Sequence, residues 1–214
     1  MKKLTDITVI LDRSGSMEYI KESTIKGFNS FLKEQQNSEG KAKLTLVQFD
    51  HEYQVVYEDV DIKNVKKLNN ETFVPRGSTA LLDAIGVTIN NTKNRIKLLS
   101  KSKRPDNTLV IIITDGEENS SNKYTREKIF SKISKRENKD NWKFIFLGSN
   151  QDAIAVGQEF GINANQSLTF NNSDEGTERA FMSVSNIVHH SRAFGNVNFS
   201  FSNEDREAQE ELNN

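Results

Sequence analysis

The chain has 214 residues, of which 35% are hydrophobic, and it contains no cysteine. This length is enough to bury the core of one α/β domain, and the absence of cysteine excludes disulfides, thiolate metal sites and cysteine nucleophiles. Lys and Arg number 29 and Asp and Glu number 30, a balance that argues against a protein built to neutralise a nucleic-acid backbone. The first apolar run, residues 7–11, is too short for a signal peptide or a membrane span. We therefore expect no nucleic acid and no membrane among the partners, and a cytoplasmic location.

The first part of the chain predicts a strand, a long helix and a hairpin. Residues 4–11 form a nearly continuous apolar run, typical of a strand covered on both faces of a parallel sheet. Residues 17–36 place apolar side chains at helical spacing, and Ser16 is a candidate amino-terminal cap for that helix. Residues 43–49 and 54–57 predict two antiparallel strands, because the connection between them is short enough for a hairpin.

The rest of the chain alternates helices with strands. Pro75 and Gly77 mark a loop ahead of the second long helix. Helices are expected over residues 61–68, 81–99, 125–135, 153–160 and from Asp174 or Thr177 to 194. Strands are expected over residues 109–113, 143–148 and 167–170. Gly161 and Gly195 are placed to end the last two helices.

This order of elements predicts a doubly wound α/β sheet that is mostly parallel, with one antiparallel edge strand and helices on both faces. We expect the domain to cover residues 1–195. Residues 196–214 are polar, and the stretch from Asn203 to Asn214 carries five acidic residues against one arginine. We expect this segment to be a mobile, acidic C-terminal tail.

Five oxygen-bearing side chains lie on three predicted loops: Asp12, Ser14, Ser16, Thr79 and Asp115. Asp12 and Asp115 each follow an apolar strand, at the edge where doubly wound sheets bind ligands. Carboxylates and hydroxyls are hard oxygen donors that suit Mg²⁺ or Mn²⁺ rather than Zn²⁺. The two carboxylates offer a charge of about −2 and the hydroxyls are weak donors. A cation held in this way can therefore accept one more anionic oxygen, such as a carboxylate of another protein.

Three segments together resemble the metal-ion-dependent adhesion site of a von Willebrand factor type A domain: Asp12-Arg13-Ser14-Gly15-Ser16-Met17, Gly77-Ser78-Thr79-Ala80-Leu81 and Ile113-Thr114-Asp115-Gly116. The resemblance extends over roughly residues 4–195 and implies a Rossmann-like sheet. It implies that the two serines and Thr79 are direct or near-direct ligands, and that the two aspartates bind the metal directly or through water. No ligand position departs from the family pattern.

The same resemblance implies a function without catalysis. In this family a cation, Mg²⁺ or alternatively Mn²⁺ or Ca²⁺, binds an acidic residue of a partner protein. Among bacterial and phage-type members the partners include AAA+ ATPases and stress-response assemblies, so we expect an unidentified protein partner of this kind. The motif does not indicate which of these subgroups of the family the chain belongs to.

Two other functions compete with this interpretation. The chain could be a subunit of a phage or stress-response assembly in which the metal mainly orders the loops. It could also be a metal-dependent phosphatase, because a strand-end Asp near a metal is similar to the haloacid-dehalogenase-type enzymes. That chemistry requires a second acid two residues on, where Ser14 stands and cannot protonate a leaving group at neutral pH. No Gly-x-x-x-x-Gly-Lys-Ser/Thr loop is present for nucleotide phosphates, so we expect no enzymatic activity.

Plainer interpretations apply to several of these residues. Ser16 and Thr79 taken singly could be helix caps, but capping does not explain five oxygen donors on three loops. Glu117 and Glu118, on the same rim as Asp115, could tune the metal or contact a partner, but we expect them to belong to a solvated loop. Asp50 and Glu52 are expected to be turn residues of the hairpin.

Overall fold

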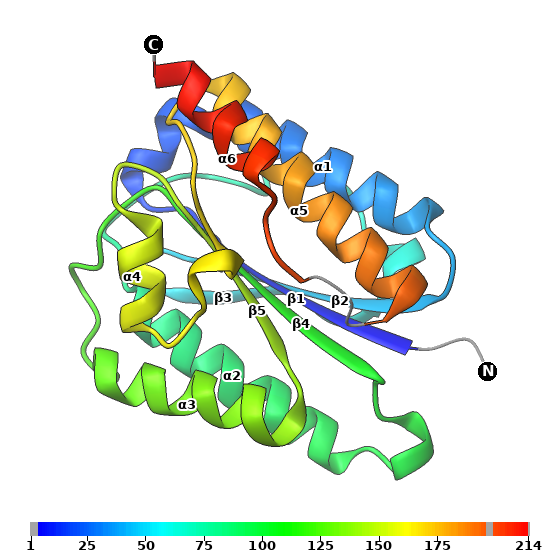
Figure 1. The fold of residues 1–214 in the computed structure, drawn as a ribbon. Coiled ribbons are helices and arrows are strands. Elements are labelled where there is room, and N and C mark those ends of the chain that lie inside the picture. The colour runs from blue at the N-terminus through cyan, green and yellow to red at the C-terminus, as the bar shows by residue number, and fades with distance from the viewer. Residues whose placement is uncertain (1–3, 196–198, 214) are drawn as a thin grey trace.

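In the computed structural model, which describes residues 4–195 and 199–213, a six-stranded sheet carries helices on both faces (Figure 1). The strands are β1 (Leu4–Asp12), β2 (Lys41–Phe49), β3 (Tyr53–Asp61), β4 (Asn107–Thr114), β5 (Lys143–Gly148) and β6 (Ser167–Thr169). They lie in the order β3-β2-β1-β4-β5-β6. All neighbours pair in parallel except β3, which pairs antiparallel with β2 at the edge. The predicted doubly wound sheet with one antiparallel edge strand is confirmed.

Two groups of helices cover the sheet. One face carries α1 (Lys21–Asn37), α5 (Asp174–Phe194) and α6 (Asn203–Glu210), and the other carries α2 (Leu81–Leu98), α3 (Arg126–Asp140) and α4 (Ala153–Glu159) (Figure 1). Short 3-10 helices are η1 (Gly15–Ile20), η2 (Ile62–Asn64), η3 (Lys101–Lys103), η4 (Ala164–Gln166) and η5 (Glu211–Asn213). Within residues 4–195 and 199–213, no helix is both long enough and apolar enough to cross a membrane.

The central strands bury both of their faces. In β1, Val9 and Leu11 belong to the core layer under α1 and α5, whereas Ile10 between them belongs to the layer under α2, α3 and α4. The same alternation occurs in β4, where Ile111 and Ile112 face opposite layers. Since side chains alternate across a strand, a sheet with helices on both faces requires apolar residues at successive positions. This explains the continuous apolar runs in the sequence.

The strand order reverses between β1 and β4. The chain moves from β1 outward through β2 to β3, then crosses to the other side of β1 and continues outward from β4 to β6. The register pairs Leu11 with Ile113, so that Asp12 and Thr114 stand beside each other at the carboxyl ends of the two strands. Ligand sites of open α/β sheets lie in the crevice at such a switch point.

The helix expected over residues 17–36 begins differently. Residues 15–20 form the 3-10 helix η1, and α1 starts only at Lys21 with Ile20 at its N-cap position. The expectation that Ser16 caps this helix is therefore wrong. The hydroxyl of Ser16 donates instead to the Asp115 carboxylate, 99 residues away in sequence.

The helix expected over residues 61–68 is also not formed beyond the single 3-10 turn of η2. Asn29 and Gln36 on α1 supply the reason. The Asn29 side chain accepts from the Leu68 N–H and donates to its carbonyl, and the Gln36 amide donates to the carbonyls of Ile62 and Val65. Because these side chains satisfy backbone groups that a helix would use, the segment lies extended along α1.

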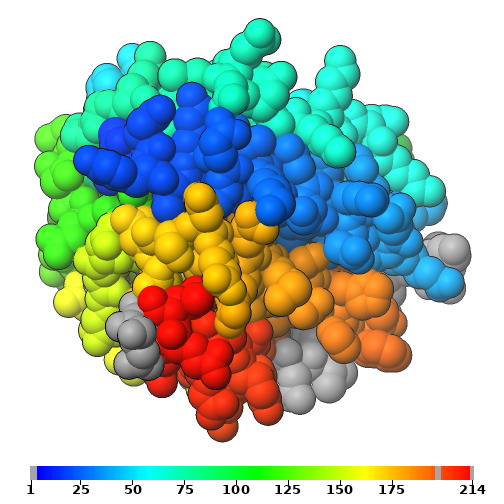
Figure 2. Space-filling view, turned by 90° about the horizontal axis from the view of Figure 1, so that it is seen from above, coloured from blue at the N-terminus to red at the C-terminus, as the bar shows by residue number. Residues whose placement is uncertain are grey.

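Residues 199–213 correct the expectation of a mobile tail over 196–214, of which residues 196–198 and 214 lie outside the described chain. Phe199 and Phe201 are buried in the core layer under α5, and α6 begins with a capping box between Ser202 and Asp205. Figure 2 shows α6, in red, packed beside α5. Two phenylalanines in a polar segment anchor it, because burying one such ring stabilises by about 1.5–3 kcal/mol. The domain boundary at residue 195 stays a prediction.

Gln209 fixes the end of α6 to the body of the domain. Its buried side chain accepts from the Asn171 N–H at 2.9 Å and donates to the Gly176 carbonyl at 3.0 Å. We expect Gln209→Ala to increase amide hydrogen exchange across α6, because each buried group left without a partner costs about 1–3 kcal/mol. Glu207→Ala, exposed on the same helix, is the matched control. Unchanged exchange in Gln209→Ala would show that this side chain does not hold α6.

Candidate metal centre

The five predicted site residues converge beyond the carboxyl ends of β1 and β4. Asp12 ends β1, and Ser14 and Ser16 lie on the turn into η1. The Ser14 and Ser16 hydroxyl oxygens are 3.2 Å apart, and the Ser16 hydroxyl donates to Asp115 Oδ1 at 2.7 Å. Thr79 lies just ahead of α2. The structure thus brings together three loops that are distant in sequence, and the bonded pair Ser16 and Asp115 is separated by 99 positions.

Distances around Gly116 show that the Thr79 hydroxyl lies near the hydroxyls of Ser14 and Ser16. A Cβ atom on Gly116 would lie 3.3 Å from Thr79 Oγ1, 3.4 Å from Ser16 Oγ and 3.9 Å from Ser14 Oγ. One point next to the Asp115 backbone is therefore surrounded by all three hydroxyl oxygens. Glycine at 116 leaves that space open, and a side chain there would crowd the hydroxyl oxygens.

Asp12 is fully buried and is held by its neighbours. Its Oδ1 accepts from the Ser14 N–H at 2.6 Å, and its Oδ2 accepts from the Thr114 hydroxyl at 2.5 Å. Burial raises the pKa of Asp12 to about 7, although the hydrogen bonds from Thr114 and Ser14 oppose the rise. The nearby charge of Asp115 makes a smaller contribution to the same rise in the pKa. The protein therefore fixes this carboxylate in place but does not neutralise it.

Asp115 has one carboxylate oxygen in use and one unused. Oδ1 accepts from Ser16, whereas the buried Oδ2 has no hydrogen-bond partner among the described residues. Burial raises the pKa of this carboxyl as well. Among the described residues no basic side chain forms an ion pair with Asp12 or Asp115. Two buried carboxylates without a counter-charge, ringed by hydroxyls, fit a divalent cation with oxygen ligands.

Arg13 sits between site residues in sequence but points away from the site. Its Nε donates to Asp50 Oδ2 at 2.9 Å, and its Nη1 donates to the Gln54 side chain. Arg76 Nε donates to the same Asp50 oxygen at 2.9 Å, and the Asp50 carbonyl accepts from the Ala80 N–H. Asp50 thereby joins the β1 loop, the β2–β3 turn and the loop that carries Thr79. The expectation that Asp50 is only a turn residue missed this role.

The side chains of Asp50, His51 and Glu52 also lie close enough together to suggest a cation site. Both carboxylate oxygens of Asp50 and one of Glu52 are already engaged. Asp50 Oδ2 binds the two guanidinium groups, its Oδ1 accepts from the Glu52 N–H at 2.6 Å, and Glu52 pairs with Arg76. A cation here would have to displace two arginines, so we assign this cluster a structural role.

Glu118 fastens the Asp115 loop to the start of α2. Its carboxylate accepts from the Leu82 N–H at 2.9 Å and from the N–H groups of Ser120 and Ser121. The neighbouring Asn119 accepts from the Thr79 N–H at 2.9 Å, and its own N–H donates to the Thr79 carbonyl. These bonds hold the loops of Asp115 and Thr79 together. The expectation of a solvated loop therefore holds for the exposed Glu117, but not for Glu118, whose half-buried carboxylate is engaged by backbone N–H groups.

Three positioning residues were missed by sequence reasoning: Thr114, Glu118 and Asp50. Thr114 could have been found, because it directly follows the apolar run of residues 109–113, just as Asp12 follows its own strand. Glu118 and Asp50 carried no such signal. Acidic residues next to glycine and asparagine are ordinary turn residues, and only the folded chain shows which donors they meet.

Comparison with known proteins gives one family match. The family model described as von Willebrand factor type A domain matches residues 6–184. No curated protein sequence matches this chain.

Solved structures share the fold at low sequence identity. One is proximal thread matrix protein 1 from the mussel byssus, whose structure is described with zinc in its metal-ion-dependent adhesion site (MIDAS) motif. It is 16% identical to this chain with a TM-score of 0.59, and the match covers 85% of this chain and 47% of that one. The vWF domain of the type V pili tip protein Mfa5 from Porphyromonas gingivalis is 12% identical with a TM-score of 0.63, covering 92% and 99%. This chain spans about half the length of the mussel protein, and at these identities the similarity shows the fold alone.

Replacing Asp50 tests its structural role. Asp50→Asn leaves the buried Arg13 guanidinium without its counter-charge, and we expect the free energy of unfolding at pH 7 to fall by about 3–5 kcal/mol. Glu52→Gln in the same turn is the control, because Glu52 is exposed and its ion pair is worth less than about 1 kcal/mol. Equal losses in the two variants, measured by urea unfolding, would contradict this role for Asp50.

The difference in unfolding free energy between the wild type and Asp50→Asn should also depend on pH. Burial alone would raise the pKa of Asp50, but the hydrogen bonds from Glu52 and Arg76 and the charges of Arg13 and Arg76 hold it below the ordinary 3.8. The ionised carboxylate therefore stabilises the fold above that value, and this contribution is lost as the pH falls through the lower folded-state pKa. The stability difference between wild type and Asp50→Asn should narrow in that acidic range.

Proposed function

The chain belongs to the von Willebrand factor type A domain family, and from that premise we propose that it is a non-catalytic module that binds a partner protein through a divalent cation. Members of this family commonly serve in adhesion or protein interaction. One observation carries the proposal for this chain. Two buried carboxylates and three hydroxyls converge at the switch point of the sheet, where no basic side chain of the described residues neutralises them.

Asp12, Ser14, Ser16, Thr79 and Asp115 would hold the cation, directly or through water. The donor set consists only of oxygens, which suits Mg²⁺, with Mn²⁺ or Ca²⁺ as alternatives. The bound cation supplies positive charge to a carboxylate of the partner. Because the protein offers a charge of only about −2 and three neutral hydroxyls, the cation keeps an affinity for that further anionic ligand. The mussel protein described with zinc in this motif supports a divalent metal at this place in the fold.

The alternative function, an assembly subunit whose metal mainly orders the loops, is less well supported. Asp50 and Glu118 already tie the three loops together through hydrogen bonds that do not involve the five site residues' side chains. A cation is therefore not needed to order these loops. The partner classes implied by the family resemblance, AAA+ ATPases and stress-response assemblies, remain the proposed candidates.

Partner capture in Mg²⁺ and in EDTA tests the proposal. The full chain, immobilised and exposed to an extract of its source cells, should retain a partner in Mg²⁺ and lose it in EDTA. Asp12→Ala should lose it in both conditions, because the carboxylate that the cation needs is gone. Asp174→Ala, exposed on the first turn of α5, is the charge-matched control and should behave as wild type. Undiminished binding by Asp12→Ala would disprove the metal bridge.

Glu118 should tune the affinity for the cation without touching it. We expect Glu118→Ala to weaken Mn²⁺ binding about tenfold by calorimetry, because residues that orient ligands typically contribute 10- to 100-fold. Glu117→Ala removes the same charge from the adjacent, exposed position and should bind Mn²⁺ nearly as wild type does. If both variants weaken binding equally, the effect is one of general charge, and the positioning role is wrong.

A further inference from the structure

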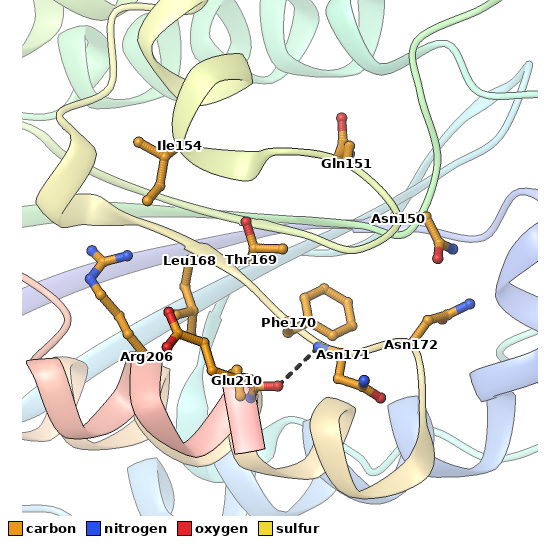
Figure 3. A pocket seen from close by; sticks show the side chains of 11 residues that line it. Asn150, Gln151, Ile154, Leu168, Thr169, Phe170, Asn171, Asn172, Arg206 and Glu210 are labelled. Atoms are coloured by element: carbon orange, nitrogen blue, oxygen red, sulfur yellow. Dashed lines mark hydrogen bonds between the residues drawn. The ribbon is translucent and has the colours of Figure 1, made fainter. Parts of the chain in front are cut away.

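A pocket of about 570 Å³ opens at the carboxyl ends of β5 and β6, between α4 and α6 (Figure 3). This volume lies within the range of sites that bind small ligands or single side chains of a partner. The sheet, the β5–α4 loop and α6 each contribute to its lining. The residues that matter below are Asn150, Gln151, Ile154, Phe170, Asn172 and Arg206.

The rim of this pocket is bonded to the loop that carries Asp115. The Asn150 side chain donates to the Asp115 carbonyl at 3.3 Å, and the Gln151 side chain donates to the Gly116 carbonyl at 3.2 Å. The Ser149 N–H donates to the Thr114 carbonyl at 3.1 Å. The pocket and the candidate metal centre are therefore neighbours, joined by hydrogen bonds to the backbone carbonyls of residues 114–116. An extended peptide advances about 3.3–3.6 Å per residue, so a segment held at one site reaches the other within a few residues.

The lining combines an apolar floor with walls of side-chain amides and one residue of each charge, Arg206 and Glu210. Leu168 and Phe170 are buried beneath the pocket, and Ile154 on α4 is half-buried at its side. Figure 3 shows Asn150 and Asn172 at one end and Arg206 at the other. The Arg206 guanidinium is held at the wall by a bond from Nη2 to the Ala164 carbonyl, and Glu210 stands on the same helix one turn away. Arg206 and Glu210 carry opposite charges, and the remaining polar lining consists of side-chain amides and a hydroxyl, which offer donors and acceptors without charge. The walls as a whole therefore match a neutral polar group better than a charged one.

We propose that this pocket is a second subsite of the binding surface, which takes an uncharged polar side chain, an amide or a hydroxyl, from the same partner segment whose carboxylate binds the metal. The inference rests on the proposed function. The subsite would let the protein distinguish among acidic partner segments. The metal alone cannot do this, because every acidic residue offers the same carboxylate to the cation. Hydrogen-bonding walls discriminate strongly against a side chain that lacks the matching group, since their own polar atoms are then left unpaired.

The pocket depends on the carboxyl-terminal segment of the chain. Arg206 and Gln209 line it from α6, which the buried Phe199 and Phe201 and the Gln209 hydrogen bonds hold in place. Without α6 the carboxyl ends of β5 and β6 would lack this wall. The segment that the sequence assigned to a mobile tail thus shapes the surface next to the metal centre.

Selection from a displayed library of short random peptides tests the subsite. The full chain is the bait, in Mg²⁺, with selection in EDTA as the blank. We expect the retained peptides to share an acidic residue and, at a fixed distance from it, Asn, Gln, Ser or Thr. Replacing that polar residue by Ala in a selected peptide should weaken binding about tenfold, the size of one lost hydrogen-bonding partner.

Two variants of the protein locate the preference in the pocket. Ile154→Trp fills it from α4, and Asn172→Trp blocks it at its exposed mouth without entering the core. Both should keep the requirement for the acid and for Mg²⁺, but lose the tenfold discrimination at the polar position. Ala155→Trp, exposed on α4 and outside the pocket lining, is the matched control and should keep it. Calorimetry with Mn²⁺ verifies that each variant retains its metal centre.

The outcomes separate the two claims. Selected peptides that share no acidic residue, or that bind equally in EDTA, overturn the proposed function and the subsite together. Peptides that share the acid but no polar position overturn the subsite alone. So does a polar preference that survives in both Ile154→Trp and Asn172→Trp.

Discussion

The parallel pairing of β1 with β4 is the contact on which the candidate site depends. The two strands leave the sheet at the same edge, and from there the chain departs in opposite directions. The strand-end residues therefore meet at the switch point of the sheet, and the loop ahead of α2 is bonded beside them through Arg76 and Gly77. The register then decides which residues they are. With Leu11 opposite Ile113, the Asp12 carboxylate lies within reach of Thr114, and Asp115 follows immediately.

Around this switch point the protein separates the groups that hold the loops from the groups that face the site. Arg13 and Arg76 neutralise Asp50 on the far side of the loops, and Glu118 is satisfied by backbone N–H groups. The carboxylates that face the site receive only neutral donors. A charge kept buried and unneutralised is costly, and the loops that present it are fixed before any ligand arrives. Such preorganisation is what a cation site with weak donors requires, because little of the binding energy is then spent on ordering the loops.

The same edge of the sheet also carries the pocket beside β6. Its polar walls are bonded to the backbone of the Asp115 loop, so the metal centre and the pocket form one surface with two chemistries. In the function that we propose, the metal centre supplies charge to any carboxylate. The pocket offers hydrogen bonds from fixed directions, which in this proposal distinguish one partner segment from another. Helix α6 lines the pocket but not the candidate metal centre. The carboxyl-terminal segment therefore contributes to this surface as well as to the core.

The sequence by itself predicted the six strands, most of the helices, the two-faced core and five candidate oxygen donors for the site. These follow from local patterns, because strand and helix periodicity and the spacing within a loop are set by residues close together in the chain. Tertiary structure alone decided that residues 65–68 stay extended, that Phe199 and Phe201 dock the last helix, and that Glu118 acts as a fastening. Each of these depends on a donor, an acceptor or an apolar surface from a distant segment. A local pattern cannot predict such an outcome, because the free energy that decides it comes from contacts that exist only after folding.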